Sequence, residues 1–162
     1  MDKNYFNQSE QNDLQLFYEF NYEHKLFDSV TPTSAKCQYD AIAIRGKRKF
    51  AVELKRRYIT LSKYKTIMIE SYKYLELLLE AKYNGLEPLY VCFLYDAVVI
   101  FNLNKLKAKP NFRIHNTIKS QGYEVNQLQE RRYMLPIEEG VVYKTNAQKD
   151  AIKQHSDIYG KG

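Results

Sequence analysis

The sequence lacks several features that mark special classes of protein. It has no Trp, only two Cys, four Pro and six Gly among 162 residues. Two Cys are too few for a disulfide scaffold, and so little Pro and Gly excludes a collagen-like or linker-rich chain. The remaining composition, 44% hydrophobic and 27% charged, is that of an ordinary globular domain. A chain of this length buries about two-thirds of its unfolded surface, so we expect one domain over residues 1–162.

A long apolar run is also missing. The first ten residues contain no apolar stretch behind a basic start, which argues against a secretory signal. The most apolar segment, residues 89–103, is shorter than a membrane span and is interrupted by Asp96. We therefore predict a cytoplasmic protein with no membrane partner, in which Cys37 and Cys92 remain reduced thiols.

Acidic residues are scarce in the middle of the chain. The protein has 25 Lys and Arg against 19 Asp and Glu, a formal charge of +6. Residues 1–30 hold six acids and two bases, whereas residues 36–73 hold eleven bases and only three acids, Asp40, Glu53 and Glu70. A basic body suits an acidic partner such as nucleic acid. The three isolated acids are the first candidates for a functional site.

Hydrophobic spacing predicts a mixed α/β fold with helices packed on one sheet. A Gly-containing turn at residues 45–48 separates two strand-like runs, which indicates a hairpin. The predicted elements are a helix over 9–21, a short strand near 26–30, hairpin strands over 35–45 and 49–57, a helix over 67–83, strands over 89–95 and 98–103, and a helix over 124–133. Residues near 134–137 and 141–143 are expected to return to the sheet.

The hairpin turn sets a register with a consequence for the acids. With Gly46 and Lys47 as the central residues of a type II′ turn, Ala41 faces Val52 and Asp40 faces Glu53. Side chains alternate along a strand, so Asp40, Glu53 and Lys55 share one face. Two carboxylates opposite each other repel, and something must offset that repulsion.

A divalent cation is the natural partner for such a carboxylate pair. Mg²⁺ prefers hard oxygen ligands and is commonly held by one or two carboxylates, with waters and substrate phosphates completing its shell. The backbone carbonyl of Leu54 is a further candidate ligand. The Lys55 ammonium, on the same face, is placed to orient a bound water or to stabilise charge on a phosphoryl group.

The pattern resembles that of the PD-(D/E)XK nuclease superfamily, in which an acid on one strand is followed by (D/E)-x-K on the next strand of a hairpin. Here the residues are Tyr39-Asp40, then twelve residues, then Glu53-Leu54-Lys55. The Pro of the family motif is absent, because Tyr39 precedes Asp40. The resemblance covers about residues 9–103 and leaves 104–162 as a C-terminal extension. It implies a restriction-endonuclease-like αβββαβ core, from a phage or bacterial member or one similar to Holliday junction resolvases.

The same resemblance implies additional site residues. Members often carry another acid on the first helix, for which Glu10, Asp13, Glu19 and Glu23 are candidates. The distance from Asp40 favours Glu19, whereas helical spacing favours Glu10, so the choice stays open. In the second helix Glu70 and Lys73 lie three residues apart, where some branches carry residues that assist at the site.

The sequence therefore predicts a Mg²⁺-dependent nuclease acting on DNA, with Mn²⁺ as a substitute cation and RNA as an alternative substrate. Backbone phosphates attract basic side chains, and aromatic rings stack on unpaired bases. The residues expected to bind phosphates are Lys47, Arg48, Lys49, Arg56, Arg57, Lys63 and Lys65. The competing hypothesis is a non-catalytic nucleic-acid-binding or assembly module on the same fold. The sequence leaves the oligomeric state open, and a homodimer is compatible with it.

Overall fold

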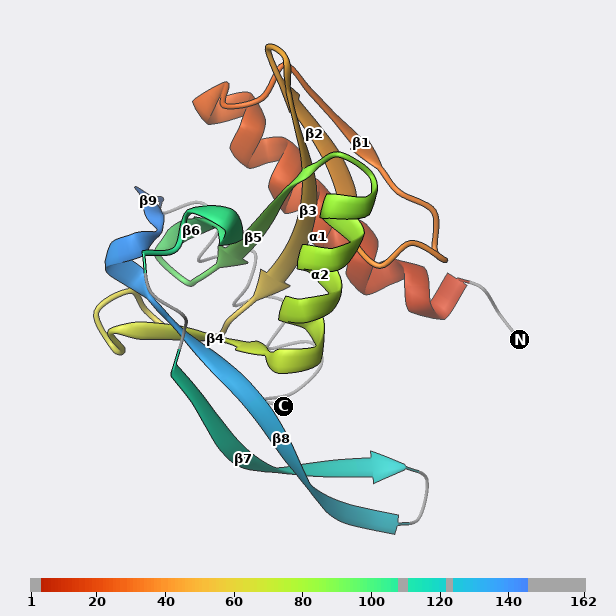
Figure 1. The fold of residues 1–162 in the computed structure, drawn as a ribbon, viewed down its shortest axis with the longest axis vertical. Coiled ribbons are helices and arrows are strands. Elements are labelled where there is room, and N and C mark those ends of the chain that lie inside the picture. Colours follow the sequence, from red (N-terminus) through yellow and green to blue (C-terminus); the bar gives the residue numbers. More distant parts are fainter. Residues whose placement is uncertain (1–3, 108–110, 122–123, 146–162) are drawn as a thin grey trace.

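The computed structural model describes residues 4–107, 111–121 and 124–145. A six-stranded mixed sheet forms the centre of the molecule (Figure 1). Its strands, in spatial order, are β1 (Ser29–Pro32), β2 (Ala41–Arg45), β3 (Arg48–Arg56), β5 (Glu87–Phe93), β6 (Ala97–Asn102) and β9 (Val141–Lys144). Only β3 and β5 run parallel; the other neighbouring pairs are antiparallel. β3 therefore lies inside the sheet, between β2 and β5.

Two helices cover opposite faces of this sheet. The first, α1 (Asn4–His24), buries Phe17 and Phe20 against the face that presents Phe50 and Val52 of β3. The second, α2 (Ser71–Tyr83), buries Leu77 and Ala81 against the other face. The α2 layer contacts the side of β3 that carries Ala51, and alternation puts Glu53 and Lys55 on that same side.

A second sheet is attached at one end of the first. It has the order β4 (Thr66–Glu70), β8 (Glu124–Pro136), β7 (Asn111–Gln121), all antiparallel. The β7–β8 ribbon extends away from the body, beyond the end of the sheet at which β3 finishes and α2 begins (Figure 1). Short 3₁₀ turns, Leu103–Lys105 and Ile137–Glu139, lead into and out of this second sheet.

The hairpin forms in the predicted register. Ala41 pairs with Val52 and Arg45 with Arg48, which leaves Gly46 and Lys47 as the two turn residues. Gly46 has φ +60° and Lys47 is not in the left-handed region, as a type II′ turn requires. The strand expected near residues 26–30 is present as β1, and β9 returns to the sheet as expected.

Three predicted elements are wrong. Residues 35–40 are turns, and pairing in β2 begins only at Ala41. The helix predicted over 67–83 is instead a strand followed by a helix, because Ile67 and Ile69 alternate into the core and β4 pairs with β8. The helix predicted over 124–133 is β8, since the ribbon and β4 supply two strand partners that override a weak local preference.

The cysteines agree with the prediction of free thiols, since Cys37 and Cys92 form no disulfide. Cys92 lies in the core, and burial raises the pKa of its thiol to about 12. Within the described residues, neither helix is long and apolar enough to cross a membrane.

We expect Phe17→Ala to lower the free energy of unfolding by about 3–5 kcal/mol, because the ring is fully buried and contacts Phe20 and Phe27. Urea unfolding followed by circular dichroism measures the change. Tyr22→Ala, on the same helix but with its side chain 86% exposed, is the control and should change stability by less than about 0.5 kcal/mol. Equal stability of the two variants would contradict the packing of α1 on the sheet.

Candidate active site at the end of β3

Asp40 occupies an irregular position just before β2. Its backbone N–H donates to the carbonyl of Val52 at 2.9 Å, although Val52 is the residue that Ala41 faces. Two residues therefore oppose one, the arrangement of a β-bulge, rather than the direct Asp40–Glu53 pairing that the register predicted. The Asp40 carboxylate accepts the Leu54 N–H at 2.8 Å, so a side chain takes the place of the missing strand partner.

This irregularity leaves the Leu54 carbonyl facing the side of β3 on which β2 has ended. The N–H and C=O of one strand residue point toward the same neighbouring strand. Because the Leu54 N–H points to Asp40, its carbonyl also faces the side where β2 has ended. The carbonyl oxygen and the Asp40 carboxylate are thus on the same open side of β3.

Glu53 is buried beside Asp40. Burial, and secondarily the Asp40 charge, raise the pKa of the Glu53 carboxyl from 4.5 to about 8. Two cations act in the opposite direction: Lys73, whose Nζ lies 3.3 Å from Glu53 Oε1, and Lys55 on the same strand. Lys73 also donates to the Gln38 carbonyl at 3.5 Å. The first turn of α2 therefore places its lysine between Glu53 and the loop before Asp40.

Among the side chains of α1 that the structure describes, Asp13 is the acid at this end of the sheet. Its Oδ1 lies 2.6 Å from Arg56 Nε, and burial raises its pKa to about 6, with Arg56 opposing the shift and the Asp40 charge adding to it. Asp40 is thus close enough to both Asp13 and Glu53 for its charge to raise the pKa of each. The i, i+4, i+7 spacing of Asp13, Phe17 and Phe20 was a signal in the sequence that places Asp13 on the buried face.

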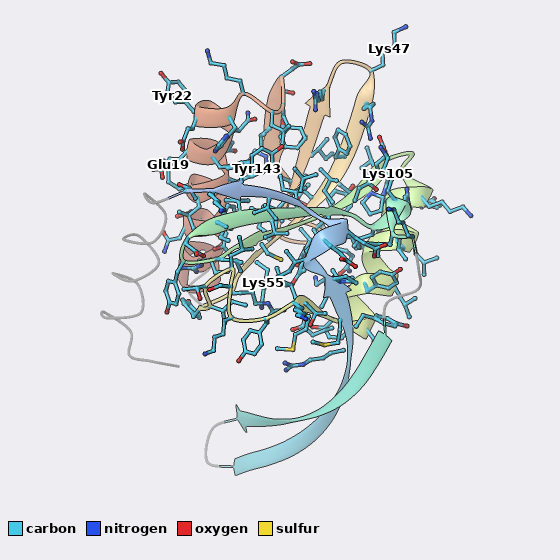
Figure 2. All side chains as sticks on the ribbon, turned by 90° about the vertical axis from the view of Figure 1, so that its left-hand side faces the viewer. Glu19, Tyr22, Lys47, Lys55, Lys105 and Tyr143 are labelled. Atoms are coloured by element: carbon cyan, nitrogen blue, oxygen red, sulfur yellow. The ribbon has the colours of Figure 1, made fainter. Side chains whose placement is uncertain are left out.

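Glu19, which the distance along the chain favoured, is exposed and accepts a hydrogen bond from Gln15 at 3.1 Å. Six residues after Asp13, it is rotated by about 240° around the helix. Figure 2 shows Glu19 on α1, well apart from Lys55. Glu23 is also exposed. The side chain of Glu10 is not among those that the structure describes.

Glu70 and Arg57 form a separate group that joins three strands. Arg57 donates to the Met68 carbonyl at 2.7 Å and to the Tyr90 hydroxyl at 3.1 Å, and lies 3.9 Å from Glu70. Burial lowers the pKa of Arg57, but Tyr90, Cys92 and Glu70 more than offset this, so it is raised overall. Glu70 is thus engaged with Arg57 rather than with Glu53.

The predicted phosphate-binding residues divide into two locations. Lys47, Arg48 and Lys49 are at the hairpin tip, about 25 Å from Lys55 at 3.3 Å per strand residue, so they do not flank the site (Figure 2). Arg48 is paired with Glu87 at 2.8 Å. Arg56 and Arg57 are at the correct end but are held by Asp13 and by the Glu70 group. Lys63 and Lys65, in the loop before β4, are exposed.

The donor chemistry at Asp40 and Glu53 suits a hard divalent cation. Glu53 is largely buried beside Asp40, and desolvation first, with the Asp40 charge second, raises its pKa; the Leu54 carbonyl faces the same side. In the described part of the chain, no group of three or more His, Cys, Asp or Glu side chains is arranged to hold a metal. Any cation here would therefore rely on two carboxylates, the backbone, water and substrate oxygens.

Comparisons with known proteins bear on the fold. Neither a family model nor a curated protein matches the sequence. Among solved structures, the chain is similar to Hjc, a Holliday junction resolvase from the archaeal hyperthermophile Archaeoglobus fulgidus. The TM-score is 0.51 and the sequence identity 14%, over 80% of this chain and 89% of Hjc.

The chain has the restriction-endonuclease-like fold of this resolvase. Within this restriction-endonuclease-like fold, Asp40 and the Glu53-Leu54-Lys55 segment stand at the beginning of β2 and near the end of β3. The αβββαβ order expected from the sequence is present, with β4 inserted before α2 and β7 to β9 added after β6.

We expect Glu53→Gln to change how stability depends on pH in the absence of metal. The Glu53 pKa is about 8 in the folded protein against an ordinary 4.5, so the folded state holds an extra proton between these values. Its contribution is complete below pH 4.5 and is lost as the pH rises through 8, at about 1.4 kcal/mol per pH unit. Urea unfolding in chelator from pH 5 to 8 should show a steeper loss in the parent than in Glu53→Gln.

The matched control is Glu19→Gln, which makes the same change at an exposed carboxyl group and should keep the pH dependence of the parent. Parallel curves for the parent and Glu53→Gln would show that Glu53 is not the group buried beside Asp40.

Proposed function

We propose that the protein is a metal-dependent nuclease that hydrolyses phosphodiester bonds of DNA. The observation that carries this proposal is the meeting of the Asp40 and Glu53 carboxylates at the end of β3, with Lys55 on the same face. The fold of the chain, similar to that of a Holliday junction resolvase, supports it. RNA is the alternative substrate, and the cytoplasm of a bacterial or phage-infected cell is the expected location.

In this proposal Asp40, Glu53 and the Leu54 carbonyl hold Mg²⁺, or Mn²⁺ in its place. When bound, such a cation lowers the pKa of water and neutralises charge on a phosphoryl group. Lys55 donates to the attacking water or to a phosphate oxygen and stabilises the charge that develops there. The positioning residues are Lys73, which orients the Glu53 carboxylate, and Asp13, which fixes Arg56 beside the site.

The phosphates on either side of the cleaved bond must be bound by basic side chains that are not already paired with acids of the protein. Lys63 and Lys65 are exposed in the loop that follows the site strand, and their charge is available to the nucleic-acid backbone. Arg56 is paired with Asp13, and Arg57 lies 3.9 Å from Glu70, so we assign both arginines a structural role in this proposal.

One observation favours the second candidate, a non-catalytic DNA-binding module on the same fold. Lys73 already lies 3.3 Å from Glu53, and Asp40 already accepts the Leu54 N–H, so both carboxylates have protein partners. A binding module would use these contacts only to hold the strand ends together.

Single substitutions at the site distinguish the two candidates. We expect Asp40→Asn, Glu53→Gln and Lys55→Ala each to lower the cleavage rate by about 10²-fold or more. The first two remove the negative charge of a proposed metal ligand, and the third removes the cation proposed to stabilise the reacting phosphate. The assay follows end-labelled duplex, single-stranded and four-way-junction DNA with Mg²⁺ or Mn²⁺.

Glu19→Gln, on the exposed side of α1, is the control and should cleave like the parent. If the parent cleaves none of these substrates with either cation but binds them with a steep dependence on salt, the binding module replaces the nuclease.

A homodimer is part of the proposal. Four exposed apolar residues, Tyr72, Leu75, Leu79 and Tyr83, lie along one stripe of α2 at i, i+3, i+7 and i+11. Their order is the same from either end of the helix, so the α2 of a second copy, placed antiparallel, would meet matching residues across a two-fold axis. Figure 1 shows α2 on the outer side of the sheet, where a second copy has access.

We expect Leu79→Glu to convert the dimer to a monomer in sedimentation velocity, because it places a charge in the centre of that stripe. Tyr22→Glu, an equally accessible site on α1, is the control and should leave the sedimentation coefficient unchanged. A parent that sediments as a monomer would contradict the dimer without touching the nuclease assignment.

A further inference from the structure

A cavity of about 370 Å³ opens beside the end of β3. This volume is within the range in which proteins hold small ligands or parts of larger ones. Its lining residues come from the loop after β3, from β4 and from the end of β8: Arg57, Tyr58, Ile59, Tyr64, Thr66, Ile67, Met68 and Met134. None of the carboxylates of the proposed metal site lines it, so it is a separate feature of the same end of the molecule.

The cavity is close to the proposed reaction site along the strand. Arg57 is the first residue after β3 and follows Lys55 by two residues, about 7 Å along the chain at the rise of a strand. The Arg57 guanidinium is fixed by the Met68 carbonyl and the Tyr90 hydroxyl, so this wall is rigid. Its Nε is buried and has no hydrogen-bond partner among the described residues, which leaves one donor of the group unused.

The remaining walls are aromatic and apolar. The Tyr58 and Tyr64 side chains are 41% and 52% exposed, an unusual degree for two rings that border one cavity. The Met68 and Met134 thioethers are polarizable and adapt to flat rings. At the rim, Lys63 Nζ lies 5.5 Å from the centre of the Tyr64 ring. A mainly apolar cavity bordered by two tyrosine rings, with a cation beside one of them, matches a nucleobase attached to a phosphate better than it matches an uncharged apolar ligand.

We infer that this cavity holds one unstacked base of the nucleic acid, close to the phosphate that the nuclease cuts. The inference rests on the proposed function and narrows its substrate class. Bases inside a regular duplex are stacked and cannot enter the cavity without the cost of leaving the stack. The substrate is therefore DNA with an unpaired or extruded base, and Tyr58 and Tyr64 supply the stacking surface.

The test measures binding without cleavage, with the full-length protein in chelator. The probes are two DNA duplexes that carry 2-aminopurine at one position, either unpaired or paired with thymine. We expect the parent to bind the unpaired probe about tenfold more tightly and to change its fluorescence through stacking. Tyr58→Ala and Tyr64→Ala should abolish this preference, whereas Tyr64→Phe, which keeps the ring, should retain it.

Tyr22→Ala is the matched control, since it removes an exposed tyrosine of α1, outside both the cavity and the proposed dimer stripe. Equal affinity of the parent for both probes, or an unchanged preference in the two alanine variants, overturns the inference. Cleavage of the same duplexes with Mg²⁺ is scored separately. A preference that depends on Tyr58 and Tyr64 in a protein that cuts neither duplex supports the base site and overturns the nuclease; cleavage with no preference does the reverse.

Discussion

The burial of Asp40 next to Glu53 is the constraint on which the structure around β3 depends. Two carboxylates removed from water and placed together are unfavourable unless other groups stabilise them. One such group is the Leu54 N–H, which donates a hydrogen bond to the Asp40 carboxylate. This donor is available because pairing in β2 begins only at Ala41. Had the regular ladder continued, a backbone carbonyl would have taken that donor. The bulge at Asp40 is thus what keeps one side of β3 open and lined with oxygen atoms.

The other stabilising contacts involve the helices on both faces of the sheet. Lys73 reaches Glu53 from the first turn of α2, on one face of the sheet, and Arg56 reaches Asp13 of α1 on the other. Both helices must therefore be docked for the carboxylates to be compensated. The two cores that dock them, around Phe17 on one side and Leu77 on the other, are in this sense part of the site. Stability of the layers and chemistry at the strand end are coupled by these ion pairs.

Local chemistry made part of this arrangement predictable. Gly46-Lys47 determined the turn and the turn determined the register, while alternation along β3 put Glu53 and Lys55 on one face. What escaped prediction depends on distant partners. Ile67 and Ile69 have the two-residue spacing of a strand, but their five-residue run joins directly to α2, and only pairing with β8 separates the two elements. Asp13 was within reach of helical spacing, but Glu19 was favoured because distance along the chain says little about position around a helix.

The basic residues show why a net charge is a poor guide to a binding surface. Arg48, Arg56 and Arg57 each lie close to an acid of the same chain, at Glu87, Asp13 and Glu70. The planar guanidinium is weakly hydrated and suits such partly buried pairs, whereas the ammonium of lysine prefers water. The arginines thus hold the fold together, and the exposed lysines keep their charge for a partner. Lys63 and Lys65 are exposed in the loop after β3, whereas Lys47 and Lys49 are at the opposite end of that strand, so the free positive charge on the site side of the molecule is smaller than the composition suggests. Specific contacts, rather than bulk attraction, must then direct a nucleic acid to Asp40 and Glu53.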